Sequence, residues 1–242
     1  VCTHSSGNHA AALARAAGLR DVPAYIVMPS SAPPVKKAAV AGYGAVLTEC
    51  EPTLEAREST LAEVRDRTGA TFVHPYDDPH VIAGQGTAAL ELLEQAPDLD
   101  VVMPPIGGGG LASGTTITVS SLRPEIELWG AEPAGADDAF RSLRDGTLHP
   151  SVKPTTIADG LLTSLSDRTF RILSGGLAGI LTVDEQTIVC AMRLLWERAK
   201  LLVEPSAAVP LAAVLANRER FEGRRVGLIL SGGNTDLENL PW

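Results

Sequence analysis

Aromatic residues, cysteines and an excess of basic charge are all scarce or missing in this chain. Aromatic residues make up 4% of the 242 residues, and the three cysteines, Cys2, Cys50 and Cys190, form no C-x-x-C pair. An odd number of isolated cysteines indicates neither a disulfide framework nor a zinc–thiolate site, so we expect buried free thiols. The formal net charge of −9 comes from scattered acidic residues, which argues against nucleic acid as a partner.

Long hydrophobic runs are lacking as well. No apolar segment reaches the length of about 20 residues that a membrane-spanning helix needs, and the first residues form no basic and apolar leader. We therefore expect a cytoplasmic protein without a membrane partner. The length allows one large domain or two smaller ones, with a substantial core in either case.

Short apolar segments alternate with amphipathic ones along the whole chain. The expected strands are 24–28, 45–48, 71–74, 101–106, 127–131, 179–183 and 226–231. The expected helices are 8–17, 34–41, 53–67, 83–95, 112–122, 184–199 and 206–217, and Gly18, Gly42 and Gly69 are expected as helix C-caps. This alternation predicts an α/β fold with mainly parallel, doubly wound sheets. A Pro/Asp-rich stretch at 75–79 is the best candidate for a crossing between two lobes, 1–73 and 74–242.

Four consecutive glycines, Gly107, Gly108, Gly109 and Gly110, follow an expected strand and precede a small-residue helical stretch. Without Cβ atoms, the backbone can turn several N–H groups into one concavity, to which the next helix adds its positive end. The run is neither a Walker loop nor a G-x-G-x-x-G fingerprint, so the pattern indicates an anion cradle rather than a nucleotide site. Taken alone, the run is equally consistent with a flexible hinge.

Two other turns combine glycine with small polar residues directly after expected strands. They are Thr3-His-Ser-Ser-Gly-Asn-His9 and Ser231-Gly-Gly-Asn234. Because ligands of parallel α/β sheets bind at the carboxyl ends of strands, we expect both turns to belong to the same site as the four glycines.

Six motifs, taken in order, resemble the pyridoxal-phosphate-dependent serine/threonine dehydratase and serine racemase family, which shares the fold of tryptophan synthase β. They are His4-Ser-Ser-Gly-Asn-His-Ala-Ala-Ala-Leu13, the four glycines, Ala131-Glu-Pro-Ala-Gly-Ala-Asp-Asp138, Thr156-Ile-Ala-Asp-Gly160, Val203-Glu-Pro-Ser206 and Ser231-Gly-Gly-Asn234. The resemblance implies a two-lobed α/β enzyme, commonly a homodimer, with pyridoxal 5'-phosphate between the lobes.

That resemblance also implies an activity. It is the elimination of water from L-serine or L-threonine to give a 2-oxo acid and ammonia, with racemisation of serine as a branch. Three alternatives stay open: a 3-hydroxyaspartate dehydratase, a β-replacement enzyme similar to cysteine synthase, and a non-catalytic homologue that binds an anionic ligand. The acidic string at 131–138 argues against the β-replacement alternative.

The resemblance assigns roles to individual residues. Cofactor contacts fall on Asn8, Gly107, Gly108, Gly109, Gly110, Leu111 and Ser231, and substrate contacts on Ser5, Ser6, Gly7 and His9. Ser6 corresponds to the hydroxyl that moves the second proton in racemisation, and Ser231 to the neutral partner of the pyridine nitrogen. From the residues alone, Ser5 and Ser6 could instead be helix N-caps.

A divalent cation (Mg²⁺, Mn²⁺ or Ca²⁺) is implied at Glu132, Ala136 and Asp138, through two carboxylates and one backbone carbonyl. A solvated acidic turn is the alternative for these residues. Two positions depart from the family pattern. Tyr76 stands where racemases tend to carry Asn, and Ala11 where Gln is common. The bulkier ring at 76 puts the substrate size and the racemase assignment in doubt.

The lysine that holds the cofactor as a Schiff base in this family has no counterpart here. Family members carry it in a Ser-x-Lys-x-Arg-Gly segment upstream of the Ser-Ser-Gly-Asn-His loop. This chain has only Lys36, Lys37, Lys153 and Lys200, which we expect to be solvated surface charges. The chain is therefore expected to be either part of a longer enzyme or a homologue without the lysine, and inactive or nearly so by itself.

Overall fold

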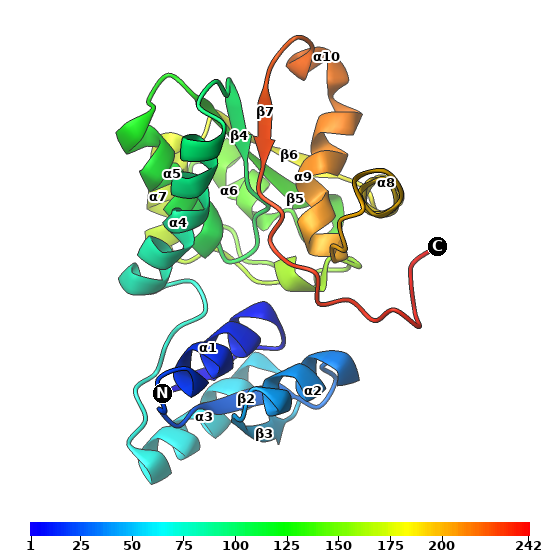
Figure 1. Cartoon of the computed structure of the whole chain (residues 1–242). Coiled ribbons are helices and arrows are strands. Elements are labelled where there is room, and N and C mark those ends of the chain that lie inside the picture. Colours follow the sequence, from blue (N-terminus) through cyan, green and yellow to red (C-terminus); the bar gives the residue numbers. More distant parts are fainter. The chain divides into compact units, whose positions relative to one another are not determined.

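The computed structural model describes residues 1–242, which divide into two units (Figure 1). The first comprises Val1–Pro75 with Asn234–Leu240, and the second comprises Tyr76–Gly233 with Pro241–Trp242. The boundary expected after residue 73 lies two residues before the observed one. Residues 234–240 group with the first unit, which a single cut along the sequence does not anticipate.

The first unit is a three-stranded parallel sheet with helices on both faces. Its strands are β1 (Cys2–His4), β2 (Tyr25–Pro29) and β3 (Val46–Cys50), in the order β1-β2-β3, and its helices are α1 (Asn8–Gly18), α2 (Pro34–Gly42) and α3 (Leu54–Thr68). Side chains of β2 alternate between the faces, as the pleat requires. Ile26 and Met28 pack with α1 and α2, whereas Val27 packs with Leu61 and Val64 of α3.

The second unit contains a four-stranded parallel sheet in the order β6-β5-β4-β7. Its strands are β4 (Val101–Met103), β5 (Glu127–Pro133), β6 (Gly179–Val183) and β7 (Val226–Leu228). Its helices are α4 (Pro79–Gln95), α5 (Gly110–Leu122), α6 (Asp138–Asp145), α7 (Asp167–Gly176), α8 (Glu185–Leu194), α9 (Pro205–Ala216) and α10 (Arg218–Phe221). Short helical turns lie at Ala134–Ala136, Asp159–Leu161 and Leu195–Ala199.

The chain adds strands on opposite sides of β4: β5 and β6 on one side, and β7 on the other. The strand order therefore reverses between β4 and β7. The chain leaves β4 through α5 on one face of the sheet and enters β7 after α8 and α9 on the other face (Figure 1). In open parallel sheets, this reversal leaves a crevice at the carboxyl ends of the two strands, where ligands bind. The glycine run follows β4 and Ser231 follows β7, so both lie at this point of the second unit.

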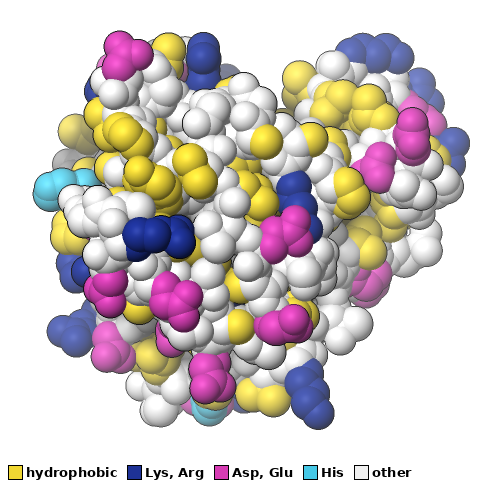
Figure 2. All heavy atoms as spheres, turned by 90° about the horizontal axis from the view of Figure 1, so that it is seen from below, with side chains coloured by type: hydrophobic (Ala, Val, Ile, Leu, Met, Phe, Trp, Pro, Cys, Tyr) yellow, Lys and Arg dark blue, Asp and Glu magenta, His cyan; other side chains and the backbone are white.

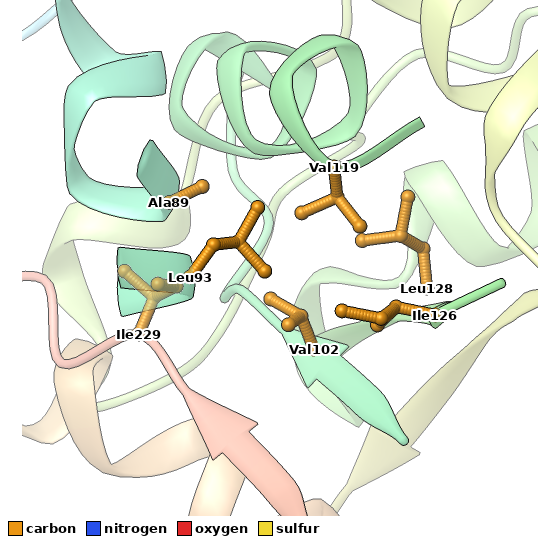
Figure 3. Packing of buried hydrophobic residues seen from close by; sticks show 7 residues of the cluster. All are labelled: Ala89, Leu93, Val102, Val119, Ile126, Leu128 and Ile229. Atoms are coloured by element: carbon orange, nitrogen blue, oxygen red, sulfur yellow. The ribbon is translucent and has the colours of Figure 1, made fainter. Parts of the chain in front are cut away.

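A hydrophobic cluster holds α4 and α5 against this edge of the sheet. Figure 3 shows side chains from both helices meeting those of β4, of β5 and the residue before it, and of the residue that follows β7: Ala89, Leu93, Val102, Val119, Ile126, Leu128 and Ile229. Burying one such Leu or Ile side chain is worth about 1.5–3 kcal/mol, so the cluster fixes α5, and with it the glycine run, on the sheet.

The α/β class with parallel sheets is confirmed, while several local expectations are wrong. Residues 71–74 form no strand, and only an isolated bridge joins Phe72 to Cys2. Gly69 is a left-handed C-cap with φ of 65°, whereas Gly18 and Gly42 are the last residues of their helices. Helices α6 and α7 were not among the expected elements, although both are short amphipathic helices.

Surface features agree with the composition. No helix combines the length and the apolarity that crossing a bilayer requires. On the face drawn in Figure 2, acidic and basic side chains are interspersed, and neither kind forms a continuous patch. Of the cysteines, Cys2 is buried, Cys50 is half-buried and Cys190 is exposed, and all three are free thiols. The expectation that all of them are buried is therefore wrong for Cys190.

Candidate functional site

The four glycines form a buried loop at the N-terminus of α5. Gly109 is the N-cap, with a left-handed φ of 85°, and Gly110 is the first helical residue. The first N–H groups of a helix have no acceptor within it, so those at the start of α5 need a partner from outside. Together with the positive end of the helix, they form a site suited to an anion.

Neighbouring side chains and backbone leave no room for a Cβ atom on this loop. A Cβ on residue 108 would lie 2.3–2.5 Å from three ring atoms of Tyr76, and one on residue 109 would lie 2.8 Å from Thr169. A Cβ on residue 107 would lie 3.0 Å from the Cα of Leu161. The loop is packed from several sides, so the flexible-hinge alternative is not supported.

Ser231 leaves the sheet from the strand beside the one that leads to the glycine run. The N–H of Ile229 donates to the carbonyl of Met103 at 3.1 Å, which extends the pairing of β7 and β4 by one residue. The residues after Ser231 are also fixed, because the N–H of Glu204 donates to the carbonyl of Gly232 at 3.0 Å. Two of the three expected turns therefore lie at one edge of the second unit.

The third turn, residues 5–9, lies in the first unit, between β1 and α1. The N–H of Ser5 donates to the carbonyl of Val27 at 3.1 Å, and Asn8 Oδ1 accepts a hydrogen bond from Asn234 Nδ2 at 2.5 Å. The N-cap of α1 is Gly7, and no side chain caps this helix. The alternative role of Ser5 and Ser6 as helix caps is therefore wrong.

Two histidines of the first unit lie in regular elements rather than in loops. His4 is the last residue of β1, and its ring stacks on Phe72 with centroids 5.6 Å apart. Burial, with smaller effects of His74 and Arg57, lowers the pKa of His4 to about 4. His9 lies in α1, with Nε2 3.2 Å from the carbonyl oxygen of Val73. His4 is therefore neutral at physiological pH.

Lys36 contradicts the expectation that all lysines are surface charges. Its side chain is 6% exposed, and Nζ lies 3.5 Å from the position that a Cβ on Gly7 would take. Lys37 pairs with Glu49 at 2.9 Å, and Lys153 is exposed. Lys200 donates to the carbonyl of Glu197. None of the four directly follows a strand.

Glu132 and Asp138 are two fully buried carboxyl groups at the end of β5 and the start of α6. Glu132 accepts hydrogen bonds from the N–H groups of Ala139 at 3.1 Å and Phe140 at 2.9 Å. Asp138 Oδ2 accepts one from the N–H of Leu165 at 3.3 Å, whereas Oδ1 is buried without a partner. Both side chains have an exposed fraction of 0%, so the solvated-turn alternative is wrong.

Burial makes ionisation of both carboxyl groups unfavourable. Desolvation is the main cause that raises the pKa of Glu132 to about 8 and that of Asp138 to about 6, against the lowering effect of their backbone hydrogen bonds. A cation beside them would reverse this cost. Oδ1 of Asp138 is buried and accepts no hydrogen bond, so it is available as an oxygen ligand. The two carboxyl groups therefore fit a hard cation such as Mg²⁺ or Ca²⁺.

The candidate residues thus lie in three separate places. Residues 5–9 lie in the first unit, and the glycine run, Leu111 and Ser231 lie at the β4–β7 edge of the second. Glu132 lies near the end of β5, Ala136 in the turn that follows, and Asp138 at the start of α6. Sequence reasoning missed the packing of Tyr76 on the glycine run, since Tyr76 was considered only as a departure from the family pattern.

The chain is similar to known proteins over nearly its whole length. Residues 1–232 match the family of pyridoxal-phosphate dependent enzymes. The chain is 52% identical over its whole length to the beta-hydroxyaspartate dehydratase of Paracoccus denitrificans and covers 77% of that protein. It is 49% identical to the serine racemase of Dictyostelium discoideum, over 99% of this chain and 75% of that protein.

Solved structures with the same fold include two racemases. The structure of maize serine racemase matches 98% of this chain, with a TM-score of 0.95 at 42% identity, and 74% of that chain is covered. The crystal structure of serine racemase from Dictyostelium discoideum matches with a TM-score of 0.92 at 49% identity, over 98% of this chain and 77% of that one.

Proposed function

Because the chain belongs to the family of pyridoxal-phosphate dependent enzymes, we propose that it serves the elimination of water from L-serine or L-threonine, followed by hydrolysis of the released enamine to a 2-oxo acid and ammonia. One observation carries this proposal: a buried loop made only of glycine opens α5 at the strand-order reversal, beside the exit of β7. The dehydratase and racemase activities of the similar proteins support it.

The residues at this edge fit the two ends of pyridoxal 5'-phosphate. Gly107, Gly108, Gly109, Gly110 and Leu111 would hold the phosphate through N–H groups at the positive end of α5. Ser231 would bond the pyridine nitrogen. When bound, the cofactor supplies an electron sink for bond breaking at the substrate Cα. A neutral hydroxyl at its nitrogen leaves that nitrogen unprotonated, which suits a substrate with a β-hydroxyl that can leave.

The loop of the first unit would bind the substrate. In this proposal Asn8 donates to the phenolic oxygen of the cofactor, and Ser5, Ser6, Gly7 and His9 contact the substrate carboxylate and Cα. Ser6 is not engaged as a helix cap, which is compatible with a role in carrying a proton. Proton return through Ser6 to the opposite face of Cα would give racemisation instead of elimination.

A divalent cation is the second group that we propose. Glu132 and Asp138 would bind it through their carboxylates and Ala136 through its backbone carbonyl, with water molecules in the remaining positions. No group of three or more carboxylate, imidazole or thiol side chains gathers here, so the protein would not surround the ion completely. A site in which the ion keeps several water molecules is typical of Mg²⁺. The ion would stabilise the β5–α6 connection without contacting the substrate.

A second substrate, 3-hydroxyaspartate, is supported by a specific observation. The beta-hydroxyaspartate dehydratase of Paracoccus denitrificans is 52% identical to this chain over 242 residues. Both candidate reactions remove a β-hydroxyl group and use the same loops. Keto-acid release from serine, threonine and 3-hydroxyaspartate, measured side by side with D-serine formation, separates the two substrates and the racemase branch.

The missing lysine limits what this polypeptide does by itself. We propose that the 242-residue chain binds the cofactor without a covalent link and has little or no turnover. Borohydride treatment of the chain with pyridoxal 5'-phosphate should then leave no modified lysine. A reduced adduct at Lys36, whose amine lies beside the Gly7 loop, would contradict this proposal. A polypeptide that joins this sequence to an upstream Ser-x-Lys-x-Arg-Gly segment should release keto acid, and its failure to do so would contradict the proposed reaction.

A further inference from the structure

We propose that residues 202–206, here called the 202–206 bracket, set the distance between the phosphate loop and Ser231, and that Ser206 is the positioning residue of this bracket. The inference rests on the proposed function, since it concerns a ligand that spans both places. Ser206 is the second residue of α9 and is 1% exposed, and Glu204 is equally buried at 1%.

One end of the bracket holds the wall of the glycine loop. Ser206 Oγ accepts a hydrogen bond from the N–H of Gly160 at 3.0 Å. The turn that contains Gly160 packs directly on Gly107, where a Cβ would lie 3.1 Å from the carbonyl oxygen of Gly160 and 3.0 Å from the Cα of Leu161. The hydroxyl of Ser206 therefore fixes the position of the turn against which the phosphate loop rests.

The other end of the bracket holds the turn that follows β7. The N–H of Glu204 donates to the carbonyl of Gly232 at 3.0 Å. A Cβ on Gly233 would lie 2.5 Å from the carbonyl oxygen of Leu202, so these two backbones are in close contact. Ser231 is thus positioned by the residues immediately after it.

The bracket itself is braced from outside. Trp196 Nε1 donates to the carbonyl of Val203 at 2.9 Å, and the N–H of Ala207 donates to the carbonyl of Glu204 at 3.0 Å. A short segment with fixed contacts at both ends acts as a spacer. A ligand with a phosphate at one end and a ring nitrogen at the other needs that spacing, whereas a free phosphate ion needs only the glycine loop.

Pyridoxine 5'-phosphate tests this spacer, because it has both ends of the cofactor but no aldehyde and so requires no lysine. We expect Ser206→Ala to weaken its binding to the chain about tenfold, because the N–H of Gly160 loses its buried acceptor. Binding of inorganic phosphate, measured by phosphorus NMR or calorimetry, should change by less than about twofold. Ser206→Thr keeps the hydroxyl and should restore the affinity for pyridoxine 5'-phosphate.

A matched control distinguishes positioning from general loss of stability. Thr53→Ala also removes a hydroxyl that accepts a backbone N–H, from Ala56 at 3.1 Å, but in the first unit. It should lower the melting temperature without changing the ratio of the two affinities. Trp196→Phe removes the brace at Val203 and should shift the ratio in the same direction as Ser206→Ala, which keeps the test valid if Ser206→Ala does not fold.

The possible results separate the spacer from the proposed function. The spacer proposal is wrong if Ser206→Ala and Trp196→Phe weaken the binding of both ligands equally, or of neither. It is also wrong if Thr53→Ala shifts the ratio of the two affinities as much as they do. In both cases the proposed cofactor site is unaffected. If the unmodified chain binds neither inorganic phosphate nor pyridoxine 5'-phosphate, the proposed function fails, and the spacer fails with it.

Discussion

The substitution Gly108→Ala should distort the phosphate loop so that it no longer binds phosphate, while the rest of the fold stays in place. The added Cβ would lie 2.3–2.5 Å from three ring atoms of Tyr76. Favourable contact between carbon atoms begins at about 3.5 Å, so the ring or the loop must move by more than about 1 Å. Overpacking of this kind costs about 1–3 kcal/mol of the free energy of unfolding.

The effect on ligand binding should exceed the effect on stability. A shift of the loop turns its N–H groups away from a common point, so we expect the affinity for pyridoxine 5'-phosphate to fall at least about tenfold, with a parallel loss for inorganic phosphate. Calorimetric titration measures both affinities, and thermal unfolding measures the change in stability. Gly223→Ala is the matched control in the same unit, because φ is 73° there but no atom lies within 4 Å of the added Cβ. It should cost about 1–2 kcal/mol of stability and leave both affinities unchanged.

The cause can be isolated by removing the ring. In the double variant Gly108→Ala/Tyr76→Ala, the methyl group of the alanine at 108 has room, so the two stability changes should be non-additive by about 0.5–3 kcal/mol. Additive changes would show that the ring does not confine the loop. Undiminished phosphate binding by Gly108→Ala would refute the assignment of this loop as the cradle.

The remaining predictions concern charge. Millimolar Mg²⁺ or Ca²⁺ should raise the melting temperature of the chain, and Glu132→Gln should remove this effect, because it deletes one of the two buried carboxyl groups that would ionise on binding the cation. Equal stabilisation of the variant would place the cation elsewhere. His4 should make the protein acid-sensitive: its folded-state pKa of about 4 lies below the ordinary 6.5, so the unfolded state binds the extra proton between these values and stability is lost as the pH falls through them. His4→Leu should flatten the pH dependence of the melting temperature in that window, and an unchanged slope would assign the acid sensitivity to other groups.

A feature of the site could be predicted when consecutive residues of the sequence carry it, and not when it depends on contacts between distant residues. The glycine run was informative because four consecutive residues without Cβ atoms have few structural uses, and the structure explains each one by a neighbour at close range. The α/β class followed from alternating periodicities in the same way. Lys36 was missed because its burial depends on the Gly7 loop, which lies far from it in sequence.

The contacts that position the site were beyond sequence reasoning. Ser206 and Gly160 are 46 residues apart, and neither residue type signals a partner. The burial of Glu132 and Asp138 was equally hidden, since an acidic string after a strand is usually solvated. Only the path of the chain from β5 through α6 to Leu165 encloses these carboxylates.

The order of the strands explains why residues distant in sequence share one edge of the second unit. Helix α5 carries the chain from β4 to β5 on one face, and α8 and α9 return it to β7 on the other, so the exits of β4 and β7 adjoin without a helix between them. An edge of this kind exposes two sets of backbone groups to one ligand. The glycine loop and Ser231 are therefore carried on adjacent strands, while Tyr76 packs on that loop from a separate segment.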